Sequence, residues 1–328
     1  MSGNRRVSRR LDGWRKLAGA TWGPPSDPQF YGDVDIDAGA LLEIQRRMRD
    51  DHGVHVTLTH LVGRAVAHGL ASVPDLQVRL AFGREHPRET TDVFFIVASG
   101  GGRDLTGVKV CRADTKSVIE IATELEHRRA AIGAGTDAAF GRSKRLLTLL
   151  PPSLLGGALR LGAWLTSDLN LDLSTLGMPR QAFGSAMVTS VGMWGIRHAY
   201  SPLAAYYRVP VLVCIGAVTE RPVSIQGRIV ARPMLTLTAT FDHRYVDGYQ
   251  AAEFAHAVED YCREPERHER QIEQDRRPGT SGHESAGGSG SRSPAYNVVK
   301  ESSMPTAAPT RSTAETQPSH GGDASTET

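Results

Sequence analysis

The stretch from Pro233 to Cys262 constrains the fold more than any other part of the chain, because its apolar rhythm changes once along its length. Up to Asp242 apolar residues alternate with Thr, a period of two that is typical of a strand with one buried face. After Gly248 the apolar residues recur at helical spacing; they are Ala251, Ala252, Phe254, Ala255, Val258 and Tyr261. The sequence therefore predicts a strand and then a helix, with His243 on the connection between them.

Two interpretations of this connection remain open at the level of local residues. In the first, Asp247 is a helix N-cap, Gln250 completes a capping box, and His243 is an ordinary polar residue at a strand end. In the second, His243 is a general base and Asp247 belongs to the frame that fixes its position. Connections that leave a rigid strand often carry functional groups, so neither interpretation is excluded.

Two longer patterns carry a resemblance to a known family. Residues Asp242–Gly248 read Asp-His-Arg-Tyr-Val-Asp-Gly and resemble the His-x-x-x-Asp-Gly signature of the chloramphenicol acetyltransferase-like superfamily. The flanking Asp and Arg make the segment most similar to the catalytic domain of the 2-oxoacid dehydrogenase dihydrolipoamide acyltransferases. Residues Met187–Gly195 resemble that family's Thr-Ile-Ser/Thr-Asn-x-Gly-x-x-Gly segment, in the same order and at nearly the same spacing. The resemblance implies an α/β fold (an α+β two-layer sandwich), with a mixed sheet and helices packed on one face.

The resemblance also assigns roles to four residues. It implies that His243 removes the proton of a thiol and that the Thr189 hydroxyl stabilises the oxyanion formed at the attacked thioester. In the superfamily an early Arg pairs with the Asp of the His-x-x-x-Asp-Gly motif. Trp14-Arg15-Lys16-Leu17-Ala18 resembles the Arg-Lys-x-Ile-Ala segment that opens the catalytic domain, so Arg15 is the expected partner of Asp247. Without the resemblance, Thr189 would be read as a β-branched residue that suits a strand.

The expected function is acyl transfer between a thioester, either acyl-coenzyme A or acyl-lipoyl, and an acceptor. The alternative is a non-catalytic trimeric scaffold or binding module that keeps the fold. The superfamily builds its active site between subunits, which implies a homotrimer. Large family cores use an apolar C-terminal anchor, whereas this chain has the polar segment Glu264–His268, so a lone trimer is expected. No lipoyl domain is recognised before Arg15, so a lipoyl protein would act in trans; no residues are assigned to coenzyme A binding.

Composition excludes several classes of protein. The 38 Lys and Arg nearly balance the 36 Asp and Glu, which argues against a dedicated nucleic-acid binder. The three isolated cysteines form no disulfide framework and indicate a reducing compartment; Cys214 and Cys262 are expected in the core and not as nucleophiles. With no apolar run of membrane-spanning length and no signal peptide, a cytoplasmic protein is expected. His52, His55, His60 and His68 lack the spacing of a zinc-protease helix, so no metal is predicted.

The predicted organisation is a basic N-terminal arm over 1–25, an acyltransferase catalytic domain over 26–265 and a charged, then disordered, tail over 266–328. Residues 140–177 form a Leu-rich insertion that departs from the family. Two short helices broken at Pro151-Pro152 are expected there. The insertion could form a subunit contact, cover an acyl pocket as a lid, or lie on a membrane surface through residues 144–165.

The remaining elements follow from local patterns. Helices are expected from Asp37, as the cap, to about Gly53, over 57–70, and from Lys116-Ser117 through Ile132. Strands are expected over 33–37, 74–82, 92–98, 108–111, 183–191 and 209–217, with a hairpin that turns at Gln226-Gly227.

Overall fold

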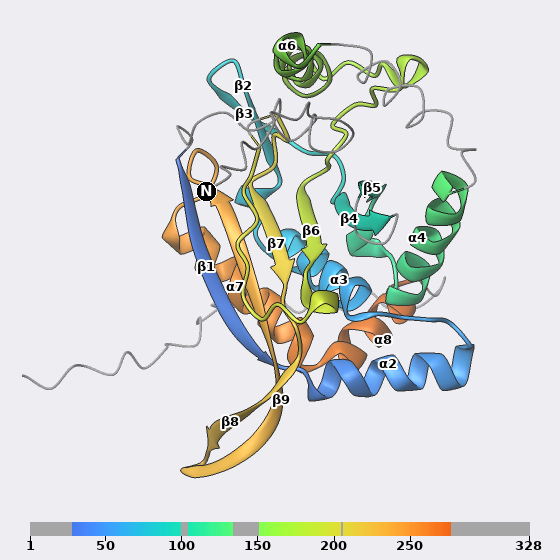
Figure 1. Cartoon of the computed structure of the whole chain (residues 1–328), viewed down its shortest axis with the longest axis vertical. Coiled ribbons are helices and arrows are strands. Elements are labelled where there is room, and N and C mark those ends of the chain that lie inside the picture. The colour runs from blue at the N-terminus through green and yellow to red at the C-terminus, as the bar shows by residue number, and fades with distance from the viewer. Residues whose placement is uncertain (1–27, 100–103, 134–150, 205, 277–328) are drawn as a thin grey trace, which may run out of the picture. The chain divides into compact units, whose positions relative to one another are not determined.

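The computed structural model describes residues 28–99, 104–133, 151–204 and 206–276. Their main feature is a seven-stranded sheet of order β1–β9–β7–β6–β4–β5, with β8 paired to β9 (Figure 1). Its strands are β1 (Gln29–Asp37), β4 (Val93–Ser99), β5 (Asp104–Val110), β6 (Ala186–Ser190), β7 (Val211–Ile215), β8 (Thr219–Ile225) and β9 (Arg228–Asp242). The β4–β6 and β6–β7 pairs are parallel and the others antiparallel, so the sheet is mixed, as expected.

Four helices pack with one face of this sheet around a common apolar core. They are α2 (Gly39–His52), α3 (Leu58–Ser72), α4 (Val118–Gly133) and α7 (Gly248–Arg263). A fifth helix, α8 (Pro265–Asp275), packs on α2 and α7. From β9, the side chains of Leu235, Leu237 and Phe241 enter that core. The predicted architecture, a mixed sheet with helices on one face, is confirmed.

The helix ends follow from local residues. Gly53 adopts φ 64° and ends α2, a conformation in which only Gly avoids strain. The Asp37 carboxylate accepts a hydrogen bond from the Gly39 N–H at 2.9 Å, but the N-cap position belongs to Ala38, one residue later than predicted. The Ser117 N–H donates to the Glu120 carboxylate at 2.8 Å, and α4 begins at the next residue, as predicted.

Two strand predictions have different outcomes. The hairpin between β8 and β9 turns at Gln226 and Gly227, both with positive φ, as expected for a two-residue turn. The strand expected over 74–82 is wrong in its first part, because residues Pro74–Leu76 form a 3₁₀ turn. Only β2 (Val78–Ala81) is extended, and it pairs with β3 (Arg84–Pro87) in a separate two-stranded sheet.

The prediction that β9 has one buried face is wrong. Thr236, Thr238 and Thr240 on its other face are at most 2% exposed. They lie under an irregular segment, residues 196–204 and 206–209, which we call the strap. The Thr240 hydroxyl donates to the Ser201 carbonyl at 2.7 Å, and that of Thr238 donates to the Ala199 carbonyl. A hydroxyl that reaches a carbonyl can be buried without an unpaired polar group, and this is why Thr alternates here with apolar residues.

The strap also closes a second, smaller apolar cluster on this face. Leu203, Tyr207 and Val209 of the strap pack with Met187 of β6 and Leu212 of β7. The sheet is therefore covered on both sides, by helices on one and by irregular chain on the other.

The last described helix, α8, is more deeply packed than a charged tail suggests. His268, Glu269 and Ile272 are all below 9% exposed. The Glu269 carboxylate accepts hydrogen bonds from the Val118 N–H and the Tyr261 hydroxyl, both at 2.7 Å. This carboxylate joins α8 to the start of α4 and to α7.

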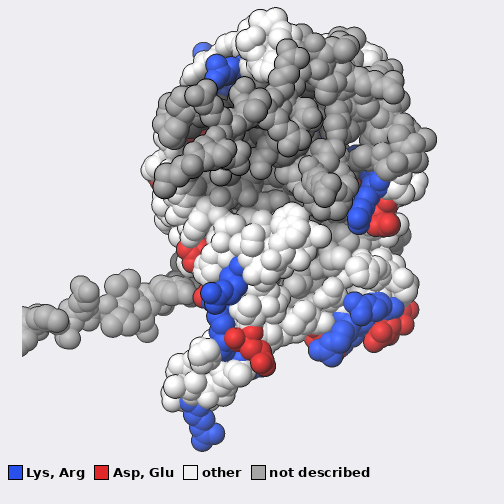
Figure 2. All heavy atoms as spheres, in the orientation of Figure 1, with Lys and Arg blue, Asp and Glu red and all other residues white. Residues whose placement is uncertain are grey.

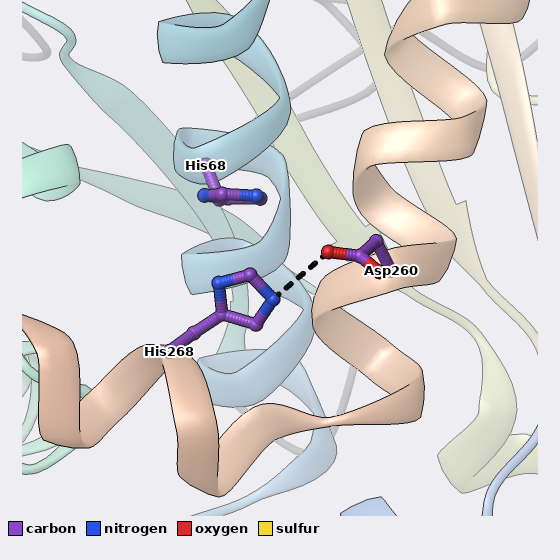
Figure 3. A group of neighbouring side chains, drawn as sticks. All are labelled: His68, Asp260 and His268. Atoms are coloured by element: carbon purple, nitrogen blue, oxygen red, sulfur yellow. Dashed lines mark hydrogen bonds and ion pairs between the residues drawn. The ribbon is translucent and has the colours of Figure 1, made fainter. Parts of the chain in front are cut away.

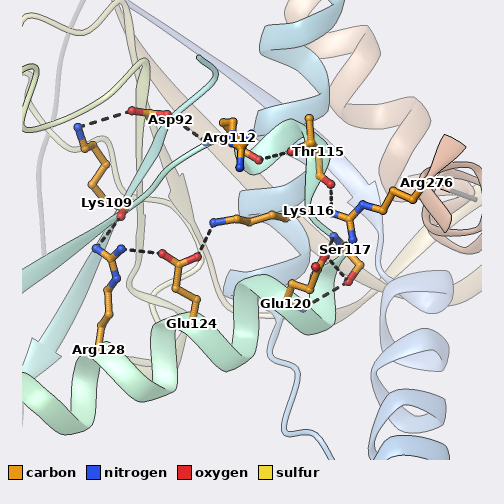
Figure 4. A network of polar contacts seen from close by, with 10 residues as sticks. All are labelled: Asp92, Lys109, Arg112, Thr115, Lys116, Ser117, Glu120, Glu124, Arg128 and Arg276. Atoms are coloured by element: carbon orange, nitrogen blue, oxygen red, sulfur yellow. Dashed lines mark hydrogen bonds and ion pairs between the residues drawn. The ribbon is translucent and has the colours of Figure 1, made fainter. Parts of the chain in front are cut away.

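A polar network fixes the outer edge of the sheet to α4 and to the end of α8 (Figure 4). Glu124 pairs with Lys116 at 2.5 Å and Arg128 at 2.9 Å. Arg276, just after α8, pairs with Glu120 at 2.7 Å and also donates to the Thr115 carbonyl. The turn residues between β4 and β5 lie outside the described residues, but the two strands pair antiparallel.

The Leu-rich insertion is described from Pro151 onward. Helix α6 (Pro152–Ala163) begins directly after Pro151 and runs into a π-turn over Trp164–Asp168. The predicted helix after the proline pair is thus confirmed, and the one before it lies outside the described residues. Leu154, Leu161 and Trp164 are 41–60% exposed. In the described part of the chain no helix combines the length and apolarity needed to cross a bilayer.

Charges of both signs lie close together on the face drawn in Figure 2, in small groups separated by uncharged residues. The described residues form ion pairs between distant segments, such as Arg47 with Glu266 at 2.8 Å and Arg221 with Asp35 at 2.8 Å. The short 3₁₀ turns not yet named are Ala113–Thr115, Ser174–Leu176 and Gly192–Trp194.

Candidate active site

His243 lies on the connection between β9 and α7, as predicted, and its side chain is exposed. Its backbone N–H donates to the Pro28 carbonyl at 2.8 Å. Its ring contacts the ring of Phe30, with centroids 5.0 Å apart and planes tilted by 58°. Phe30 in turn stacks on Phe241 at 5.0 Å. The start of β1 therefore positions the imidazole at the end of β9, a contact between distant segments that the sequence did not reveal.

The residues that flank His243 lock the turn. The Asp242 carboxylate accepts hydrogen bonds from the Arg244 guanidinium at 2.5–3.1 Å and from the Arg244 N–H at 3.0 Å. The Asp242 N–H donates to the Pro210 carbonyl at 2.9 Å. This carboxylate is buried, and a buried charge needs such a partner. The Asp and Arg of the signature therefore hold the backbone on which His243 stands, a role that the pattern alone did not assign.

Asp247 has the geometry of the first interpretation. Its carboxylate accepts a hydrogen bond from the Tyr249 N–H at 3.1 Å, and the Gln250 side chain accepts one from the Asp247 N–H at 3.3 Å. This is a capping box at the start of α7. The capping box fixes the end of the connection that joins α7. Asp247 can therefore cap the helix and also help to hold the segment that carries His243. Arg15, the expected partner of Asp247, lies outside the described residues, and that pairing stays a prediction.

Thr189 lies near the end of β6 and is partly buried. Two glycines shape the turn that follows. A Cβ on Gly192 would lie 2.4 Å from the Gly216 carbonyl oxygen, and Gly195 has φ 75°. Neither place tolerates a side chain without strain. The Gly-x-x-Gly part of the motif is thus explained by a tight backbone turn just after Thr189.

The structure does not bring Thr189 and His243 together within one chain. In the strand register, Thr189 of β6 pairs with Cys214 of β7, and Cys214 pairs with Thr238 of β9. Thr238 lies five residues before His243. Strand geometry puts the two about 17 Å apart along the sheet and about 10 Å across it. They also lie toward opposite faces, because Thr189 shares the face of Met187 in the strap cluster, whereas the His243 ring contacts Phe30 beside the helix-covered core. One thioester group cannot reach both residues of the same chain.

An apolar cavity of about 220 Å³ lies between the edge of the sheet and α7. Phe30, Phe241, Ala251 and Ala255 are among its lining residues. Small residues on α7 leave this space open, and Phe30 contacts the His243 ring. The cavity can accept an aliphatic group close to the imidazole.

Known proteins share both the sequence around Thr189 and His243 and the fold that positions them. Residues 176–269, which contain Thr189 and His243, match the family model described as the catalytic domain of 2-oxoacid dehydrogenase acyltransferases. A Saccharomyces cerevisiae relative, the mitochondrial dihydrolipoyllysine-residue succinyltransferase component of the 2-oxoglutarate dehydrogenase complex, is 34% identical over 235 residues. That match covers 70% of this chain and 42% of the yeast protein. The chain spans less than half the length of the curated relatives it matches.

Solved structures show the same fold. A probable dihydrolipoamide acetyltransferase from Listeria monocytogenes aligns with a TM-score of 0.55 and 21% identity, over 80% of this chain and 96% of that one. The cubic core of a pyruvate dehydrogenase multienzyme complex aligns with a TM-score of 0.54 and 16% identity, over 80% and 95%. The resemblance read from the two motifs is therefore confirmed: the chain carries the catalytic-domain sequence of the 2-oxoacid dehydrogenase acyltransferases over residues 176–269, on the fold of the dihydrolipoamide acetyltransferase cores.

Proposed function

We propose that the chain is an acyltransferase that moves an acyl group between a thioester of coenzyme A or lipoamide and an acceptor. The observation that carries this proposal is the exposed imidazole of His243 on a connection fixed at both ends. A thiol is mostly protonated at neutral pH, and His243 accepts its proton as it attacks the thioester. Such general-base catalysis contributes about 10²- to 10⁴-fold.

Thr189 of a second copy supplies the oxyanion donor. Within one chain, Thr189 and His243 are too far apart to form one site. In a symmetric oligomer, Thr189 of one subunit can lie beside His243 of another across the interface. The segment that follows Thr189 exposes large apolar side chains, among them Met193 at 72%, Trp194 at 48% and Ile196 at 44%. Exposed apolar groups of this kind favour an interface between subunits. The assembly that we propose is the homotrimer.

The acyl group enters the apolar cavity beside His243, so an uncharged aliphatic acyl chain fits better than a dicarboxylic one. The lining is almost entirely apolar apart from Asp33 and Thr238. A free carboxylate placed there would lose its hydration without gaining a cationic partner. Coenzyme A or a lipoyl protein in trans delivers the thioester.

The decisive measurement is thiol release from a panel of acyl-coenzyme A thioesters of different chain length. We expect His243→Ala to lower the rate by about 10²- to 10⁴-fold and Thr189→Val by about 10²- to 10³-fold. Aliphatic acyl groups should react faster than succinyl. If wild type and His243→Ala show the same rates with every thioester and acceptor, the non-catalytic scaffold replaces the enzyme as the explanation of this fold.

Mixed oligomers test the shared site directly. When His243→Ala and Thr189→Val chains are refolded together in equal amounts, about a quarter of the interfaces pair an intact His243 with an intact Thr189. Activity should return to about that fraction of wild type. Mixed oligomers that form but stay inactive would contradict a site built between subunits.

A further inference from the structure

Three side chains from three helices meet near the C-terminal end of α7 (Figure 3). They are His68 of α3, Asp260 of α7 and His268 of α8. The His268 Nε2 lies 3.1 Å from an Asp260 carboxylate oxygen, and the two imidazole centroids are 4.4 Å apart. One nitrogen from each His and one Asp260 oxygen all lie within 4.8 Å of one another.

Two imidazoles and a carboxylate are a ligand set that divalent transition metals prefer. Ligand bonds of about 2.1 Å in a tetrahedron put ligand atoms about 3.4 Å apart. The group would have to contract by about 1.4 Å at its widest pair, which side-chain rotations can supply. Within the described residues neither ring nitrogen of His68 has a hydrogen-bond partner, so a metal would not compete with an existing bond there.

Neutral imidazoles present lone pairs that can bind a metal ion. The Asp260 side chain is 41% exposed while that of His268 is 6% exposed, so the group opens to solvent on one side and leaves room for water ligands.

Two cations oppose metal binding. Arg64 is almost fully buried one turn before His68, and Arg267 comes within 3.9 Å of the Asp260 carboxylate. The Glu269 carboxylate, 3.6 Å from the Arg64 guanidinium, offsets the first of them. These charges predict moderate affinity rather than the tight binding of a structural zinc site.

We propose that His68, Asp260 and His268 bind one divalent transition metal ion, such as Zn²⁺, and that the ion fastens α8 to α3 and α7. Asp260 is thirteen residues from Asp247, so about 20 Å of helix separates the group from the His243 connection. The ion therefore has a structural or regulatory role outside acyl transfer. The sequence could not predict this set, because His68 lies far from the other two in the chain and the eight-residue spacing of Asp260 and His268 is not a recognisable metal-ligand spacing.

The test uses the full chain after treatment with a chelator. Titration with Zn²⁺, followed by calorimetry, should show one ion bound per chain and a higher midpoint of thermal unfolding. Titration with Co²⁺ should give the visible absorption of a site with nitrogen and oxygen ligands. His68→Ala and the more conservative His268→Gln should each weaken binding by about tenfold or more and abolish the thermal shift.

The matched control is His127→Ala, which removes an exposed histidine of α4. It should bind the ion as wild type does. Circular dichroism of each metal-free variant verifies that the fold is kept; where His68→Ala fails this check, His268→Gln carries the test. Absence of one-to-one binding in wild type, or equal binding by wild type and a folded His268→Gln variant, would overturn the proposal.

Discussion

The two faces of the central sheet are buried by different means, and each carries half of the proposed catalytic pair. On the helix face, apolar side chains of the strands meet amphipathic helices, and the contact of Phe30 with His243 extends that core to the active site. On the strap face, threonines of β9 donate hydrogen bonds to carbonyls of an irregular segment 39 residues away in sequence. Thr189 lies on this second face.

The difference shows what specifies each face. Apolar packing tolerates changes that conserve volume, so the helix face depends on pattern and size. A buried hydroxyl is stabilising only while its particular acceptor stays in place. The strap face therefore depends on one arrangement of backbone, and four predictions probe this contrast, from the largest effect on stability to the smallest.

Phe95→Ala should be the most destabilising change, at about 3–5 kcal/mol in the free energy of unfolding. Phe95 is fully buried on the helix face, and a Cβ on Gly63 would lie 2.1 Å from its ring. The neighbouring Phe94 points to the strap side and is only partly buried, so Phe94→Ala serves as the control in urea unfolding. An equal loss from both variants would mean that the two faces are packed alike.

Thr240→Val tests the strap face and should cost about 1–3 kcal/mol, because the partly buried Ser201 carbonyl loses its donor. Thr240→Ser keeps the hydroxyl and should cost less in the same unfolding experiment. If Thr240→Val proved as stable as wild type, hydrogen bonds from β9 to the strap would not stabilise the packing of this face.

Acid should weaken the helix face through His60. Burial, with nearby His55, lowers the pKa of His60 from 6.5 to about 4, and its Nδ1 accepts a hydrogen bond from the Thr57 N–H at 3.2 Å. The unfolded chain thus binds more protons between these pH values, and stability falls as pH drops from 6.5 to 4. The expected contribution is about 1–2 kcal/mol, less than the pKa shift alone would give, since solvent reaches part of the ring.

The measurement is the free energy of unfolding against pH, with His60→Gln as the variant that should flatten the profile over this window. His127→Ala, at an exposed position, should leave the slope unchanged. An unchanged slope for His60→Gln would show that other groups set the acid sensitivity.

Asp247→Ala should cost about 1 kcal/mol, the usual value of a helix N-cap. Asp247→Asn keeps the cap and should be nearly as stable as wild type. The same pair separates the two interpretations of Asp247 when acyl transfer is measured: loss of activity in a stable Asp247→Asn enzyme requires a role for the charge, such as the expected pairing with Arg15. Full activity of Asp247→Asn would leave capping as its only role.

Much of the fold could be predicted from local patterns, for identifiable reasons. The change of rhythm at Gly248 located β9 and α7, and Gln226-Gly227 located the hairpin, because periodicity and turn conformation depend on residues close in sequence. The threonines of β9 led to the wrong prediction that one face of this strand is exposed. A threonine suits both a solvated strand face and a buried face that offers its hydroxyl a hydrogen-bond acceptor. The strap that supplies the acceptors has no periodic pattern.

The sequence by itself determined the position of His243 between strand and helix and the motif that places Thr189 before a glycine turn, and through its resemblance to a family it implied the mixed α/β architecture. Only the tertiary structure decided that Pro28 and Phe30 hold the imidazole and that His68 meets Asp260 and His268. The reason is that rhythm and capping are encoded within a few residues, whereas these contacts depend on how distant segments cross. The separation of Thr189 from His243 belongs to the second kind, because it follows from strand order and register.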